Sequence, residues 1–308
     1  MTILALGNIS DTAQFRRDII LARKGPAAKK SLGQHFLKDK AVVQAALQMA
    51  QVQAADTVVE IGPGRGILTK ALLDQGAEVV AIELDPRMVQ YLEATLANPR
   101  LTVIQEDVLK VDWRQLLAGK PQVKVVANLP YYITSPIVQS LLASRELFQN
   151  IVLMVQKEVA ERIAAEPGGR TYGILSVAVQ VYAEVELGTI VPPAAFDPPP
   201  EVHSQLIKLT PRKKISLATS EEVFFRIVRA AFSQRRKTIL NSLLAANLLA
   251  CQTKADQKEK IAQLLETVDI DPAQRPETIS IEAYAALAEA VFPNLKSEKL
   301  SIQRDFKK

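Results

Sequence analysis

The sequence predicts an α/β protein: a parallel β-sheet covered by helices on both faces, followed by a smaller, all-α C-terminal domain. Between residues 56 and 155, short apolar strands alternate with helical patterns, as in doubly wound sheets. From Ser220 onward the apolar residues recur with helical spacing and form no convincing strand. The 308 residues are enough for one large domain or two unequal ones.

The strands of the first domain are short, apolar and rich in β-branched residues. Glycines follow the first of them, a helical pattern covers residues 66–75, and Pro86 suits the first turn of the next helix. After the prolines at 192, 193 and 198–200, His203–Leu209 alternates like a half-exposed strand. The five predicted sheet strands are Thr57–Ile61, Glu78–Glu83, Leu101–Gln105, Val123–Asn128 and Ile151–Val155.

Four helices are predicted in the C-terminal region: Glu222–Phe232, Lys237–Ala250, Lys254–Val268 and Ile281–Val291. The strand pattern ends near Pro211 and helical spacing follows it, which suggests a domain boundary there. We therefore expect a basic N-terminal extension (1–28), a ligand-binding domain (29–212), a helical domain (213–295) and a polar tail (296–308).

The composition excludes several classes of protein. A single cysteine, Cys251, rules out an internal disulfide framework, and two histidines make a histidine-built metal site unexpected. Apolar runs stay short of the ~18 residues of a membrane helix. The N-terminus lacks the basic stretch of a secretory signal, so a cytoplasmic protein is expected.

The charge is unevenly distributed. Residues 1–30 carry a net +4 and residues 205–240 a net +7, whereas the rest of the chain sums to −6. Two basic segments on a mildly acidic body indicate a polyanionic partner. Solvated loops and helix faces explain the charge count equally well, so charge alone leaves both interpretations open.

A glycine loop follows the first strand. Gly62, Gly64 and Gly66 lie between that strand and the next helix, where a side chain would block a ligand from the backbone. The spacing differs from GxGxxG, which weakens a nicotinamide or flavin interpretation. The lysine and hydroxyl of a phosphate-binding P-loop are also missing.

Acidic residues end the next two strands. Glu83 can accept hydrogen bonds from ribose hydroxyls, and Asp107 can accept one from an adenine amino group. Together with the glycine loop they indicate a pocket for an adenosine-containing ligand that needs no pyrophosphate. S-adenosylmethionine fits this description. If Glu83 is considered without the other residues, the alternative is that it is a surface acid that caps a helix.

The fourth strand ends in Asn128, Leu129, Pro130 and Tyr131, at the sheet edge where ligands bind in open α/β folds. These residue types suit methylation of an exocyclic amine. The Asn128 amide oxygen and a backbone carbonyl such as that of Leu129 can accept from the amine, while Tyr131 stacks on the base. Such a reaction needs positioning rather than a strong base. The alternative is that Asn128 and Pro130 only shape a turn, because an Asn-x-Pro sequence also suits a turn that has no catalytic role.

Six segments together resemble the ribosomal RNA adenine dimethyltransferases, and they follow one another in order over residues 29–245. The resemblance implies a Rossmann-like class I methyltransferase sheet and is greatest to the small-subunit enzymes. These dimethylate N6 of two adjacent adenines in the hairpin near the 3′ end of the small ribosomal RNA. The segments are Lys30–Leu37, Val58–Gly64, Ile82–Asp85, Asn128–Tyr131, Phe196–Ser204 and Phe232–Leu240.

The resemblance assigns roles to the cofactor site, which would take S-adenosylmethionine and no metal. Asn128 would contact both the cofactor and the target amine. Glu83 would bind the ribose and Asp107 the adenine. The remaining cofactor contacts would come from His35, Leu37, Gly62 and Gly64.

The resemblance also assigns roles around the target base. Phe196 would stack opposite Tyr131. Many relatives carry Asn where this chain has His35 and Tyr132, so His35 would contribute mainly its backbone. Leu129 stands where many DNA adenine methyltransferases have Pro, and we interpret it as part of a pocket that accepts an already monomethylated amine.

A basic cluster lies near a predicted helix start and comprises Arg229, Arg235, Arg236 and Lys237. These side chains can contact RNA phosphates. Phe232, among them at helical spacing, fits a core position better than a base-stacking one.

Three functions are compatible with the motifs. The favoured one is a monomeric small-subunit (16S) rRNA adenine dimethyltransferase that acts on the immature subunit. A large-subunit (23S) relative of the antibiotic-resistance type is the second. The third is a non-catalytic ribosome-assembly or nucleic-acid-binding factor. The Phe196–Ser204 and Phe232–Leu240 segments favour the first over the second, and intact Asn128–Tyr131 argues against the third.

Overall fold

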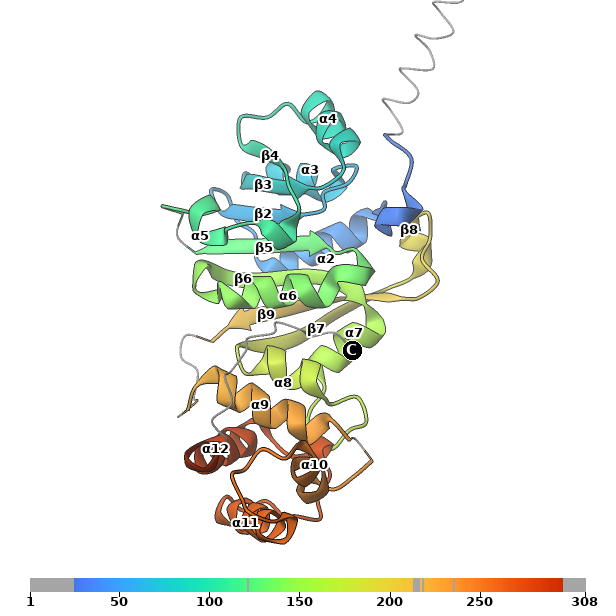
Figure 1. Cartoon of the computed structure of the whole chain (residues 1–308). Coiled ribbons are helices and arrows are strands. Elements are labelled where there is room, and N and C mark those ends of the chain that lie inside the picture. The colour runs from blue at the N-terminus through green and yellow to red at the C-terminus, as the bar shows by residue number, and fades with distance from the viewer. Residues whose placement is uncertain (1–24, 121, 213–216, 218, 235, 296–308) are drawn as a thin grey trace, which may run out of the picture. The chain divides into compact units, whose positions relative to one another are not determined.

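The computed structural model describes residues 25–295 except 121, 213–216, 218 and 235 (Figure 1). Most of the predicted basic extension, all of the polar tail and Arg235 therefore lie outside the described residues. The strands are β1 (Phe36–Leu37), β2 (Thr57–Ile61), β3 (Glu78–Glu83), β4 (Leu101–Gln105), β5 (Val123–Asn128), β6 (Phe148–Gln156), β7 (Ala183–Val191), β8 (Phe196–Asp197) and β9 (Ser204–Pro211).

The α-helices are α2 (Lys40–Ala50), α3 (Ile67–Asp74), α4 (Pro86–Thr95), α5 (Trp113–Leu116), α6 (Thr134–Ala143), α7 (Lys157–Ala164), α8 (Ile174–Gln180), α9 (Glu221–Phe232), α10 (Ile239–Ala246), α11 (Lys254–Thr267) and α12 (Ile281–Val291). Pro86 is the first residue of α4, as predicted, and the Asp85 side chain accepts from the backbone N–H of Arg87 to cap that helix. None of the described helices is long and apolar enough to cross a membrane.

Seven strands form one sheet in the order β4-β3-β2-β5-β6-β9-β7, and β1 pairs with β8 in a separate two-stranded sheet. The pairs β2–β3, β3–β4, β2–β5 and β5–β6 are parallel. Strand β2 is buried over its last four residues, as expected for a parallel strand covered on both faces. The predicted alternation of strands and helices is thereby confirmed. It brings the carboxyl ends of β2, β3 and β5 to one edge.

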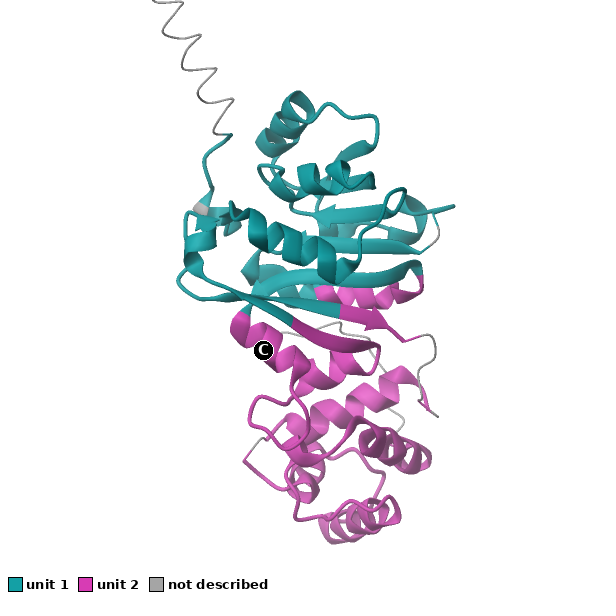
Figure 2. Ribbon diagram, turned by 180° about the vertical axis from the view of Figure 1, so that it is seen from behind, with its two compact units in different colours: residues 1–137, 147–156, 188–208 teal, residues 138–146, 157–187, 209–308 magenta. Residues whose placement is uncertain are grey.

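The chain divides into two compact units, each assembled from several segments (Figure 2). Unit 1 comprises residues 1–137, 147–156 and 188–208, and unit 2 comprises 138–146, 157–187 and 209–308. The sequence suggested contiguous domains that meet near residue 212, whereas these units interleave along the chain. The core of unit 1 includes α2 and α3 residues packed with strand residues such as Val58, Val79 and Val126.

The core of unit 2 gathers α8, α9, α10, α11 and α12. Phe232 packs there between Tyr172 and Tyr284, with ring centroids 6.1 and 5.9 Å away. This confirms the prediction that Phe232 is a core residue. Helix α10 is shorter than predicted, because Thr238 caps its start and Asn247 ends it in the left-handed conformation.

The two-residue strands β1 and β8 were not predicted, and in the large sheet β6 and β7 differ from the prediction for local reasons. Strand β6 begins three residues earlier than Ile151, because the buried Asn150 donates its side-chain amide to the Ala50 carbonyl and is tolerated inside the strand. Strand β7 was not predicted. Gly188 interrupts its pattern, and a Cβ at that position would lie 2.7 Å from the Met49 sulfur, so close packing requires glycine there.

Candidate active site

A single pocket in unit 1 collects the predicted ligand-binding residues at the carboxyl edge of the sheet. Its walls come from the segment before β1, the loop after β2, the ends of β3 and β4, and the turn after β5. The predicted residues that line it are His35, Leu37, Gly62, Gly64, Glu83, Asp107, Asn128, Leu129, Pro130 and Tyr131.

The glycine loop adopts a conformation that only glycine takes easily. Gly62 and Gly64 have φ angles of +67° and +54°. A Cβ on Gly64 would lie 2.8 Å from the Phe36 ring, so a larger residue would collide with the segment that forms β1. Gly62 donates its N–H to the Ile82 carbonyl at 2.9 Å. The loop is therefore held against the end of β3, with its backbone lining the pocket.

Glu83 joins that loop to the turn after β3. One carboxylate oxygen accepts from the Gly64 N–H at 3.2 Å and the other from the Asp85 N–H at 2.9 Å. Burial raises the pKa of Glu83 above its ordinary value, and the two backbone donors oppose that rise. Asp107 accepts from the Leu109 N–H at 3.0 Å and caps the short turn after β4. Both acids line the pocket.

Glu60 is a pocket residue to which the sequence interpretation gave no role. Its side chain is 1% exposed, and its Oε2 has no hydrogen-bond partner among the described residues. Burial raises its pKa to about 8, and the neighbouring Glu83 carboxylate adds to the rise. The available signal was a single acid within the otherwise apolar strand Thr57–Ile61, directly before the glycine loop.

The free energy of unfolding should depend on the protonation of Glu60. Its folded pKa of about 8 exceeds the ordinary 4.5, so the folded protein binds the extra proton between these values. Stability should therefore fall as pH rises through this window, by on the order of a few kcal/mol. Denaturant unfolding at several pH values should give a flatter profile for Glu60→Gln. Parallel profiles for the two proteins would contradict a protonated Glu60.

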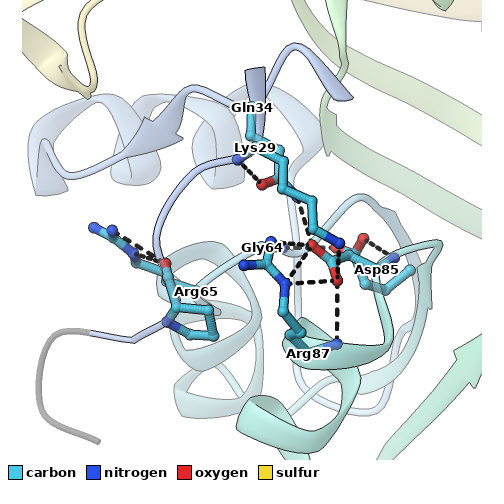
Figure 3. A network of polar contacts seen from close by, with 8 residues as sticks. Lys29, Gln34, Gly64, Arg65, Asp85 and Arg87 are labelled. Carbon is cyan, nitrogen blue, oxygen red and sulfur yellow. Dashed lines mark hydrogen bonds and ion pairs between the residues drawn. The ribbon is translucent and has the colours of Figure 1, made fainter. Parts of the chain in front are cut away.

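A second unassigned acid, Asp85, is the centre of a polar network beside the pocket (Figure 3). Its buried carboxylate forms an ion pair with Arg87 at 2.6 Å and with Lys29 at 3.4 Å. Gln34 donates to Asp85 at 3.4 Å and also accepts from the Lys29 N–H at 2.8 Å. Hydrogen bonding to Arg87 holds the pKa of Asp85 well below its ordinary range. The network fixes the 29–34 segment on the turn after β3.

Arg65 fastens the same segment from the glycine loop. Its guanidinium donates twice to the Pro26 carbonyl, lies 4.5 Å above the Phe36 ring and pairs with Asp197 at 2.8 Å. The segment that precedes β1 is thus tied both to the glycine loop and to the turn after β3. Sequence spacing gave no indication of this, because the partners lie 39 and 132 residues away from Arg65.

Asn128 ends β5 with its amide oriented by the backbone. Its Nδ2 donates to the His35 carbonyl at 3.2 Å. Because a carbonyl can only accept, the NH₂ group must face His35, and Oδ1 is the acceptor that the amide offers elsewhere. The His35 backbone therefore orients Asn128, whereas its predicted contact with the cofactor stays a prediction. Leu129 donates its N–H to the Met154 carbonyl of β6 and anchors the turn.

Tyr131 is half-buried and held at its hydroxyl. That hydroxyl lies 2.6 Å from the Ser204 Oγ, and burial raises its pKa above the ordinary value. The ring stacks on the His35 imidazole with centroids 5.8 Å apart and planes 22° apart. The His35 ring is itself fixed by a 2.8 Å contact between Nδ1 and the Pro198 carbonyl. His35 therefore contributes its side chain as well, which the sequence interpretation did not foresee.

Phe196 departs from its predicted position. It is 1% exposed, pairs with Leu37 across β1 and β8, and belongs to the core of unit 1 instead of the pocket wall. A large apolar ring gains more from burial there than from exposure beside a polar site. The aromatic partner of Tyr131 in this structure is His35.

The described members of the basic cluster belong to unit 2. Arg229 is exposed in the last turn of α9, and Arg236 and Lys237 are exposed between α9 and α10. Arg235 lies outside the described residues. Among the described residues, no group of three or more His, Cys, Asp or Glu side chains is placed to hold a metal ion.

Comparison with known proteins identifies the family. A family model described as ribosomal RNA adenine dimethylase matches residues 25–286. The chain belongs to this family. Two relatives called ribosomal RNA small subunit methyltransferase A are 44% identical (Geobacillus thermodenitrificans, 89% of this chain and 94% of the relative) and 45% identical (Moorella thermoacetica, 88% and 96%).

Solved structures agree with the ribosomal RNA adenine dimethylase fold. A dimethyladenosine transferase from Plasmodium falciparum is 27% identical with a TM-score of 0.71, covering 84% of this chain and 98% of that one. The 23S rRNA methyltransferase ErmE has a TM-score of 0.64 at 24% identity, covering 83% and 99%, and supports the fold alone. The predicted family, class I methyltransferase fold and rRNA-methylating enzyme class are confirmed. Family and fold imply a methyl donor of the S-adenosylmethionine type.

Proposed function

We propose that this protein transfers methyl groups from S-adenosylmethionine to N6 of two adjacent adenines in the 3′-terminal hairpin of small-subunit rRNA, giving N6,N6-dimethyladenine. The observation that carries the proposal is the orientation of Asn128. With its NH₂ group held by the His35 carbonyl, the amide presents an acceptor at the edge of an adenosine-type pocket. Family membership supports the reaction class.

The pocket residues fit a cationic adenosine ligand. Glu60 has a buried carboxyl oxygen with no partner among the described residues, and a polar group of a bound ligand can supply the hydrogen bond that this atom lacks. Glu83 would accept from the ribose and Asp107 from the adenine amino group, while Gly62 and Gly64 admit the ligand to the backbone. Leu37 would pack beside it. When bound, S-adenosylmethionine supplies an electrophilic methyl group on a positively charged sulfur.

The residues of the turn after β5 position the target amine. Asn128 Oδ1 and the Leu129 carbonyl accept its N–H groups, which directs the nitrogen lone pair toward the methyl donor. Tyr131 stacks on the base, while its hydroxyl is held at the Ser204 Oγ. Pro130 restricts the turn that carries these groups. The methylated nitrogen is acidic and releases its proton to water, so no side chain must act as a strong base.

The basic cluster is proposed to bind the RNA. Arg229, Arg235, Arg236 and Lys237 contact phosphates of the folded subunit, whose shape is read more than its sequence. We propose a monomeric, cytoplasmic enzyme that acts on immature small subunits. The 23S alternative is not favoured, because the relatives with 44–45% identity carry the small-subunit name and the ErmE likeness concerns fold alone.

The proposal is tested by methyl transfer from labelled S-adenosylmethionine to purified, unmodified small subunits, with large subunits as the second substrate. We expect label in the small subunits alone, and mass spectrometry should find two adjacent dimethyladenosines. Labelling of large subunits alone would support the 23S alternative. Monomethyladenosine as the end product at saturation would contradict the role given to Leu129.

A further inference from the structure

Two consecutive tyrosines after β5 have opposite environments. Tyr131 is half-buried, with its hydroxyl at Ser204 and its ring on His35. Tyr132 lines the same pocket, yet its side chain has 58% exposure, the highest among the exposed large hydrophobic residues of the described chain. A single exposed apolar residue is ordinary on a protein surface. An exposed aromatic ring at the rim of a ligand pocket differs from such a residue, because it lies where a bound ligand can contact it.

The Tyr132 ring rests against a glycine. Gly33 has a φ of +56°, and a Cβ there would lie 3.3 Å from Tyr132 Cδ1 and 3.5 Å from Cε1. Glycine therefore lets the ring lie close to the backbone of the segment before β1. The part of the Tyr132 ring that does not face Gly33 remains exposed.

The support beneath Tyr132 is held by the network of Figure 3. Gln34, next to Gly33, donates to the buried carboxylate of Asp85, and Lys29 forms an ion pair with the same group. Because the segment under the Tyr132 ring is already ordered, the ring loses less conformational freedom when a ligand covers it. The exposed Tyr132 ring is therefore preorganised to stack on a planar ring of a ligand.

We propose that Tyr132 is a stacking platform for the nucleobase adjacent to the target adenine in the RNA strand. This inference rests on the proposed function and deepens it. Once one base sits against Tyr131, the chain connectivity of the RNA keeps its neighbour near the pocket rim, where Tyr132 lies. Base–aromatic stacking is a principal means of binding unpaired RNA, and it tolerates any base. The occupant is thus the strand that supplies the target.

The first test compares Tyr132→Ala, Tyr132→Phe and the control Ile190→Ala in methyl transfer to small subunits. Ile190 is 48% exposed on β7 and does not line the pocket. We expect Tyr132→Ala to raise the KM for the subunit by about tenfold, with Tyr132→Phe within about twofold of wild type. The control should behave like wild type. The dissociation constant of S-adenosylmethionine should be unchanged in all three.

The second test follows the stacked base directly. Hairpin RNA carrying 2-aminopurine on either side of the target adenine should lose fluorescence when it binds wild type and Tyr132→Phe, and lose much less with Tyr132→Ala. An unchanged KM in Tyr132→Ala would overturn the inference. So would an equal defect in Tyr132→Phe, which would indicate a hydroxyl contact, or weakened cofactor binding in Tyr132→Ala, which would place the ring against the methyl donor. Absence of transfer by wild type would instead count against the proposed function.

Discussion

Replacing Asn128 with alanine should lower the rate of methyl transfer by roughly 10²–10³-fold, the size expected for removing a preorganised polar group at a reacting centre. The amide oxygen that accepts from the target amine is lost, and the His35 carbonyl loses its donor. Initial rates with labelled S-adenosylmethionine and unmodified small subunits measure the effect. The thermal midpoint should change little, because Asn128 is partly exposed at a strand end.

Asn98→Ala is the matched control for this prediction. Asn98 lies outside the pocket and caps the turn before β4 by accepting from the Arg100 N–H at 2.9 Å. It should retain wild-type transfer rates. Equal incorporation by wild type and Asn128→Ala would defeat the mechanism proposed for the Asn128–Tyr131 turn.

Replacing Glu83 with alanine should weaken S-adenosylmethionine binding by about 100-fold or more, because a ribose acceptor and the anchor of the glycine loop are lost together. The Gly64 and Asp85 N–H groups would lose their acceptors. Leaving such buried donors unpaired should also lower the free energy of unfolding by about 2–4 kcal/mol. Isothermal titration calorimetry and denaturant unfolding measure the two effects.

Glu78→Ala serves as the control at the opposite end of the same strand. Glu78 is exposed, and its ion pair with Lys120 at 3.3 Å lies on the surface, where such pairs contribute little. Both cofactor affinity and stability should stay close to wild type. Tight cofactor binding by a folded Glu83→Ala protein would show that the carboxylate does not hold the ligand.

Much of the site could be predicted because of the regularity of parallel sheets. Glu83 ends β3 and Asn128 ends β5, on either side of β2, and Asp107 follows β4. Parallel strands bring their carboxyl ends to one edge, so residues that are far apart in sequence converge without any need to know their side-chain contacts. The glycine loop was predictable for a related reason, since left-handed φ angles at Gly62 and Gly64 require that residue type.

Other residues of the site could not be assigned from sequence, because their roles depend on partners in distant segments. Asp85 and Arg87 look like an ordinary helix start, and only folding adds Lys29 and Gln34 to their network. Phe196 looked like a stacking residue within its proline-rich segment, yet pairing with Leu37 buries it.

The sequence by itself determined the alternation of strands and helices, the glycine loop, the acids at strand ends and the Asn128–Tyr131 turn. All of these depend on local backbone preference and on periodicity, which are readable along the chain. Only the tertiary structure decided that His35 stacks on Tyr131 and that Tyr132 is exposed at the rim. It also decided that one buried carboxyl oxygen of Glu60 has no hydrogen-bond partner among the described residues. Burial and pairing are properties of segments brought together by folding, so no local pattern encodes them.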